Sequence, residues 1–111
     1  MELYIGGYAQ GKLQYVLKKY PEIDADRIVN HLHLWVKDLL MEHQDAEKII
    51  LAYVKEHEDC ILICDEVGNG IVPMDADQRE YRERLGRLLI ELAGQADVVE
   101  RVICGIGQRI K

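Results

Sequence analysis

Apolar residues along the chain occur in two patterns, which predict two kinds of secondary structure. Short continuous runs are typical of strands buried on both faces of a parallel sheet. Such runs predict strands at Leu3–Ile5, Ile28–Val29, Cys60–Cys64 and Val98–Ile103, and a last extended piece at Gln108–Lys111 after the turn Gly105–Gly107. These strands are spread over the whole chain.

Between the strands, apolar residues recur every three or four positions, as in amphipathic helices. This spacing predicts helices from Gly11 to Tyr20, Leu32 to Leu40, Asp45 to Val54 and Asp77 to Gln95. Pro21 ends the first helix, and Asp45 is the predicted N-cap of the third. Strands that alternate with helices predict an α/β fold: a three-layer sandwich with a mostly parallel sheet and helices on both faces.

A glycine-rich loop follows the first strand and fits the phosphate-binding pattern G-x-x-x-x-G-K. In this motif backbone amides cradle phosphate, the lysine neutralises it, and the N-terminus of the next helix faces the anion. The candidate nucleotide-binding residues are Gly6, Gly7, Tyr8, Ala9, Gln10, Gly11, Lys12 and Leu13. Lys12 is a catalytic candidate that would contact the terminal phosphates. The alternative is that the glycine-rich loop is a plain turn without a ligand. The loop predicts a single P-loop nucleotide-binding domain over residues 1–111, like a P-loop NTPase reduced in size.

The metal-binding part of this motif is incomplete. The lysine is normally followed by Ser or Thr, whose hydroxyl holds Mg²⁺, but here Leu13 follows, and the chain contains no Ser or Thr. Asp65 and Glu66, at the end of the strand Cys60–Cys64, resemble a Walker B element, in which a carboxylate holds or orients Mg²⁺. Asp65 and Glu66 are therefore the metal candidates and Glu66 is the second catalytic candidate. The alternative is that Asp65 and Glu66 are a solvated acidic pair at the end of a strand. The sequence does not distinguish GTP from ATP as the bound nucleotide.

The composition of the chain limits which classes of binding partner are expected. The chain has 111 residues, of which 49% are hydrophobic and 31% charged, and its net charge is −6. An acidic balance argues against nucleic acid and anionic membrane surfaces as partners. No apolar run reaches membrane-spanning length and the N-terminus lacks a basic region, so a cytoplasmic protein is expected. The three cysteines lie in apolar runs and are expected to be buried free thiols.

Histidines and arginines are weaker candidates. No zinc-type spacing connects the four histidines, so surface or helix-end positions are expected, including for His31 and His33. The arginines of the helix Asp77–Gln95 alternate with glutamates, which favours a solvated face. A phosphate contact by Arg82 or Arg87 is the alternative.

Three sequence motifs together resemble one known family. They are Gly6-Gly7-x-x-x-Gly11-Lys12, Glu66-Val67-Gly68-Asn69-Gly70-Ile71-Val72-Pro73 and Gly105-Ile106-Gly107-x-x-Ile110-Lys111. This combination is similar to the bifunctional adenosylcobinamide kinase/adenosylcobinamide-phosphate guanylyltransferase family of cobalamin biosynthesis. Weaker similarity covers the helix with Leu32, Trp35, Val36, Leu39 and Leu40.

The resemblance implies an activity and a set of partners. Enzymes of this family use a nucleoside triphosphate to phosphorylate the cobinamide hydroxyl, and then pass GMP to that phosphate through a guanylylated histidine. By resemblance, Gly6, Gly7, Gly11 and Lys12 would hold the triphosphate, with Glu66 close to the reacting end. The implied partners are a nucleotide, a corrinoid (adenosylcobinamide) and further copies of the chain in a homo-oligomer.

Departures from the family pattern leave the activity open. Leu13 replaces the loop serine, Leu89-Ile90 replace a polar pair, and the segment that carries the guanylylated histidine is missing. If the chain is an enzyme, it is expected to be a transferase with kinase-like chemistry. The alternatives are a catalytically inactive paralogue that binds a nucleotide or corrinoid and has a regulatory role, and a structural assembly protein.

Overall fold

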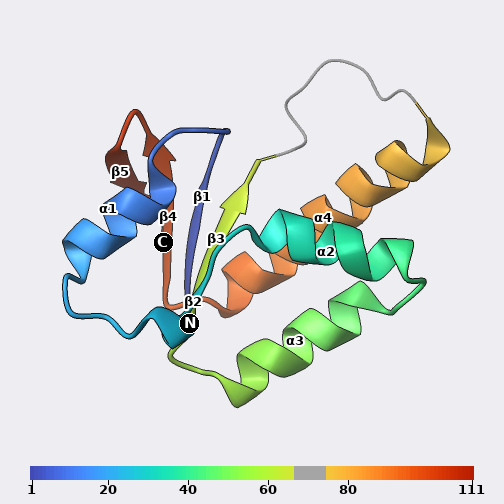
Figure 1. The fold of residues 1–111 in the computed structure, drawn as a ribbon, viewed down its shortest axis with the longest axis horizontal. Helices are drawn as coiled ribbons and strands as arrows, with labels where there is room; N and C mark the ends of the chain where they lie inside the picture. Colours follow the sequence, from blue (N-terminus) through green and yellow to red (C-terminus); the bar gives the residue numbers. More distant parts are fainter. Residues whose placement is uncertain (67–74) are drawn as a thin grey trace.

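The structure is a computed structural model that describes residues 1–66 and 75–111, and a five-stranded sheet lies at its centre (Figure 1). In chain order the elements are β1 (Glu2–Gly6), α1 (Lys12–Lys19), a 3₁₀ turn (Ala25–Arg27), β2 (Ile28–Val29), α2 (Leu32–Met41), α3 (Ala46–Glu56), β3 (Ile61–Asp65), α4 (Ala76–Gln95), β4 (Val98–Ile103) and β5 (Ile106–Arg109). The predicted glycine-rich loop over 67–73 lies outside the described residues.

The strand order is β2-β3-β1-β4-β5, and all pairs are parallel except β4 with β5. Gly6 at the end of β1 is in register with Asp65 at the end of β3. On the other side of β1, Ile5 is in register with Arg101 of β4. The carboxyl ends of three parallel strands therefore meet at one edge of the sheet, where ligands of open α/β sheets bind.

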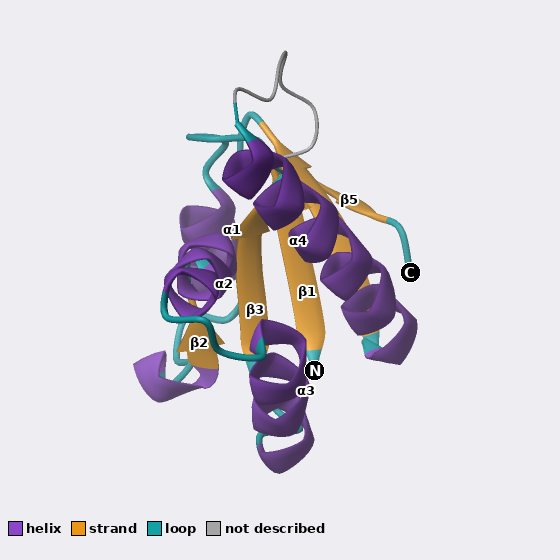
Figure 2. Cartoon of the chain, turned by 90° about the vertical axis from the view of Figure 1, so that its right-hand side faces the viewer, coloured by secondary structure: helices purple, strands orange, loops and turns teal. Residues whose placement is uncertain are grey.

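Helices cover both faces of the sheet. Figure 1 shows α1 on one side of the strands and α2, α3 and α4 on the other side. In Figure 2 these three helices lie in front of the sheet. Because side chains alternate along a strand, Tyr4 and Ile63 pack toward α1, whereas Leu3 and Leu62 pack toward α2, α3 and α4. The predicted three-layer, P-loop-like α/β fold with a mostly parallel sheet is confirmed.

Local signals in the sequence set several of the helix ends. The Asp45 carboxylate accepts a hydrogen bond from the Lys48 amide and caps α3, as predicted. Asp75 caps α4 in the same way. Helix α1 ends at Lys19, two residues before Pro21. The extended piece predicted to begin at Gln108 begins at Ile106 instead, because it pairs antiparallel with β4 as one hairpin.

One prediction about the cysteines is wrong. Cys60, directly before β3, and Cys64, on β3, are buried, but Cys104 is exposed. Cys104 has a positive φ of 52° in the turn between β4 and β5, so the apolar run around it ends before its side chain can join the core. None of the described helices is both long enough and apolar enough to cross a membrane.

Candidate functional site

The predicted phosphate-binding loop connects β1 to α1, and two of its glycines are required by the geometry. A Cβ on Gly6 would lie 2.4 Å from the carbonyl oxygen of Val102, so only glycine allows β1 to end this close to β4. Gly11 immediately precedes α1 and has a left-handed φ of 82°. The loop is thus positioned by both the sheet and the helix.

Lys12 is the first residue of α1 and is 7% exposed. Its Nζ lies 2.7 Å from the carbonyl oxygen of Gly7, inside the loop, and 2.6 Å from Oδ1 of Asp65. The strand register therefore brings together two predicted site residues, the loop lysine and the first acidic residue after the apolar strand. This ion pair places the positive charge of Lys12 at the carboxyl end of β3.

Asp65 has a second partner, His33, which the sequence pattern does not indicate. Its backbone amide donates a hydrogen bond to Nδ1 of His33 (3.1 Å), and its Oδ2 lies 3.4 Å from Nε2 of the same ring. His33 was predicted at the surface or a helix end; the surface position is wrong, because the residue is 7% exposed in the first turn of α2. Burial lowers the pKa of His33, although the charge of Asp65 opposes this effect.

Glu66 also has a cationic partner. Oε2 of Glu66 lies 3.1 Å from a guanidinium nitrogen of Arg101 on β4. The Glu66 amide donates to the carbonyl oxygen of Gly6 (2.8 Å), which holds the acidic residue beside the start of the loop. Arg101 was not a candidate, because only the pairing of β4 with β1 brings it to this edge.

The middle of the loop contacts the β4–β5 turn. The Gln10 side-chain oxygen accepts a hydrogen bond from the Cys104 amide, and its backbone carbonyl accepts one from Gly105, both at 2.8 Å. Tyr8 is 85% exposed and Ala9 has a positive φ of 57°. These contacts position the loop, and they give a structural reason for the glycine turn near the end of the chain.

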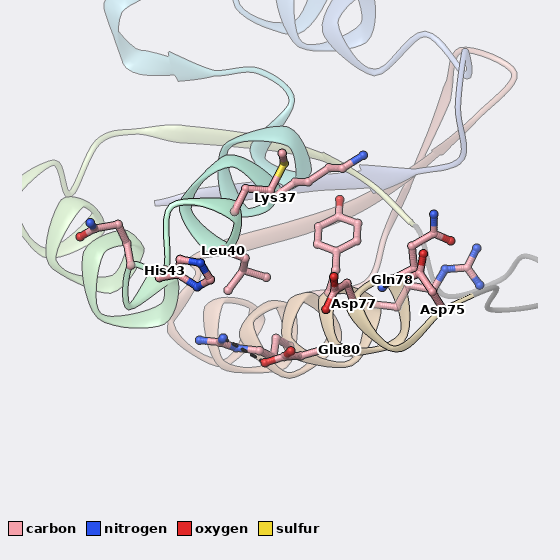
Figure 3. Close-up of a pocket in the computed structure, with 12 residues that line it drawn as sticks. Lys37, Leu40, His43, Asp75, Asp77, Gln78 and Glu80 are labelled. Atoms are coloured by element: carbon pink, nitrogen blue, oxygen red, sulfur yellow. Dashed lines mark hydrogen bonds and ion pairs between the residues drawn. The ribbon is translucent and has the colours of Figure 1, made fainter.

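The arginines of α4 lie outside this cluster. Arg87 forms an exposed ion pair with Glu83 at 3.9 Å, as expected for a solvated face. Arg82 lines a groove of about 860 Å³ between α2 and α4, and no residue of the phosphate-binding loop lines that groove. Figure 3 shows Leu40 of α2 and Glu80 of α4 among the lining side chains. A phosphate contact by either arginine stays a prediction.

Carboxylate oxygens suit Mg²⁺, so Asp65 and Glu66 fit the chemistry of the predicted ion. Each has a cation beside it, Lys12 for Asp65 and Arg101 for Glu66. Among the described residues, no three or more His, Cys, Asp or Glu side chains are grouped so that they could hold a metal ion. Nucleotide phosphates and water would have to supply the remaining ligands.

A glycine loop between a strand and a helix, a lysine in the first helical turn and an acidic end on the neighbouring parallel strand define a P-loop-like α/β protein. Within that class, the family model described as "Cobinamide kinase / cobinamide phosphate guanyltransferase" matches residues 7–110. The chain belongs to this family.

Two curated relatives carry the name bifunctional adenosylcobalamin biosynthesis protein CobU. The chain is 45% identical to the Salmonella typhimurium protein over 51 residues, which is 46% of this chain and 28% of that protein. It is 36% identical to the Escherichia coli protein over 67 residues, which is 60% of this chain and 37% of that protein. The matches thus span about a third of the length of these relatives.

Proposed function

We propose that residues 1–111 form a single nucleotide-binding domain that holds the triphosphate of GTP or ATP in the loop Gly6–Leu13. The observation that carries this proposal is the position of Lys12, with its Nζ 2.7 Å from the Gly7 carbonyl inside the loop. A lysine at this place neutralises phosphate as a point charge, and the α1 N-terminus adds the partial positive charge of its free amides.

The reaction proposed is kinase-like phosphoryl transfer to a corrinoid hydroxyl in adenosylcobalamin biosynthesis. Support comes from membership of the family and from the names of the two relatives. Lys12 would stabilise the charge on the transferred group, and Glu66 would stand near the reacting end. Guanylyl transfer is not included, because no histidine of this chain lies in a motif that matches the guanylylated histidine of the family.

Mg²⁺ is part of the proposal through Asp65 and Glu66. The ion would neutralise phosphate charge, as in other phosphoryl-transfer enzymes. Because Asp65 is paired with Lys12 and Glu66 with Arg101, the ion has to compete with these cations for the carboxylates. Mg²⁺ and phosphate are therefore expected to enter together, with Lys12 passing from Asp65 to the phosphate.

A second candidate function is nucleotide binding without transfer, in a homo-oligomer with a regulatory or assembly role. Leu13 favours it, because a leucine cannot provide the metal-binding hydroxyl of the motif. The two candidates share the binding step and differ only in whether a phosphoryl group leaves the nucleotide.

Calorimetric titration of GTP and ATP, with and without Mg²⁺, tests the shared step. Lys12→Ala should abolish binding, whereas Lys18→Ala, an exposed lysine of the same helix, should leave it unchanged. Equal binding by the Lys12→Ala variant would contradict the proposed site. Single-turnover transfer of labelled γ-phosphate to adenosylcobinamide then separates the candidates: labelled corrinoid supports the kinase, and binding without label supports the second function.

A further inference from the structure

Asp65 is held at three points, two of them by His33 and the third by Lys12. The Asp65 amide is bonded to Nδ1 of His33, Oδ2 faces Nε2 of the same ring, and Oδ1 contacts Nζ of Lys12. The carboxylate therefore has little freedom to rotate away from the lysine.

The backbone of His33 is also held by a second helix. The Tyr81 hydroxyl of α4 donates a hydrogen bond of 2.9 Å to the backbone oxygen of His33. His33 is buried in the first turn of α2, which packs against β3 and α4. The support for Asp65 thus comes from two helices and does not depend on an exposed side chain.

The Lys12 ammonium has three donors, and two are directed at Gly7 and Asp65. An incoming triphosphate must share or displace the carboxylate, whose negative charge also repels it. Both partners of the ion pair are largely removed from water, at 7% and 16% side-chain exposure, so the competing contact is only weakly screened.

We propose that His33 is a positioning residue that keeps the Asp65 carboxylate on Lys12, so that Asp65 competes with phosphate for the lysine until a divalent cation takes the carboxylate. This inference rests on the proposed function, because it concerns the same phosphate site. It follows that the triphosphate binds well only when a cation binds together with it. Weakening the hold on Asp65 therefore increases the affinity for metal-free triphosphate.

The test measures calorimetric binding of inorganic tripolyphosphate in EDTA. Asp65→Asn removes the competing charge and should tighten binding by about 5-fold to 150-fold, the usual range for the coupling between two binding events. His33→Asn should tighten it by a smaller factor. The asparagine oxygen can replace Nδ1 as acceptor for the Asp65 amide, but the contact of Nε2 with Oδ2 is lost.

His31→Asn is the matched control, because it removes a ring that lies edge-on to His33, with centroids 5.6 Å apart, but takes no part in the contacts of His33 with Asp65. His31 has a left-handed φ of 58° and precedes α2, where asparagine is well tolerated, so binding should match that of the unmodified protein. Adding Mg²⁺ should strengthen binding to the unmodified protein and have little effect on Asp65→Asn.

A gain in affinity cannot be produced by simple damage to the fold, and thermal unfolding of each variant checks that it is folded. Unchanged or weaker metal-free binding by His33→Asn overturns this inference, even if Asp65→Asn binds more tightly, and it leaves the proposed nucleotide site intact. Tripolyphosphate binding that survives Lys12→Ala instead overturns the proposed site itself. The two failures are therefore distinguishable.

Discussion

Gly6→Ala tests whether the loop depends on the close approach of β1 to β4. The added Cβ would lie 2.4 Å from the carbonyl oxygen of Val102, about 1 Å short of the 3.4 Å at which ordinary contact begins. The opposing atom belongs to the backbone of β4 and cannot rotate away as a side chain could. One of the two strands must therefore move within a sheet that is covered on both faces.

The expected cost follows from the size of this clash. Overpacking in a well-packed interior typically destabilises by about 1–3 kcal/mol, and a backbone obstacle places Gly6→Ala in the upper half of that range. At about 4 °C per kcal/mol for a chain of this size, the midpoint of thermal unfolding should fall by roughly 8–12 °C. Urea unfolding should show a lower midpoint with an unchanged slope, because the surface exposed on unfolding stays the same.

Gly7→Ala is the matched control, one residue further along the loop. Its Cβ would lie 3.7 Å from Cγ of Gln10, which is ordinary van der Waals contact, so its free energy of unfolding should change by no more than about 0.5 kcal/mol. Equal stability of the Gly6→Ala and Gly7→Ala variants would refute the reasoning that glycine is needed for strand approach.

Two further predictions concern a buried carboxylate and the thiols. Burial would raise the pKa of Glu100, but the hydrogen bond from Lys19 and other contacts lower this pKa below the ordinary 4.5. The stabilisation that ionised Glu100 provides is therefore complete above pH 4.5 and is lost as the pH falls through the lowered pKa. Glu100→Gln should flatten the acid dependence of urea stability, and an unchanged dependence would contradict this account. In the folded protein, only the exposed Cys104 should react quickly with a thiol reagent, because burial raises the pKa of Cys64 to about 12. Fast labelling of a second thiol would count against the structure.

Much of the fold could be predicted from the sequence, because its signals are local. Continuous apolar runs gave the strand positions, and the spacing of residues such as Leu85, Leu88 and Leu92 gave the long helix, which begins one residue earlier than predicted. The loop motif needed only neighbouring residues, Gly6 to Lys12, and the order of a strand and a helix around it. The motifs also led to the correct family.

The partners in the candidate site could not be predicted in this way. His33 lies in an apolar helical stretch, where one histidine carries no signal of its own. Arg101 resembles any charged residue near a strand end. The only available hint was that His33 follows one predicted strand and Arg101 lies within another, but several strand orders were compatible with the pattern.

The sequence by itself therefore determined the elements, the class of fold, the family and the phosphate-binding motif, since periodicity and contiguous motifs depend on residues close together in the chain. The tertiary structure alone decided that Lys12 faces Asp65, that His33 holds the same carboxylate, and that Arg101 reaches Glu66. The physical reason is the strand order β2-β3-β1-β4, which brings residues from four distant segments to one edge of the sheet.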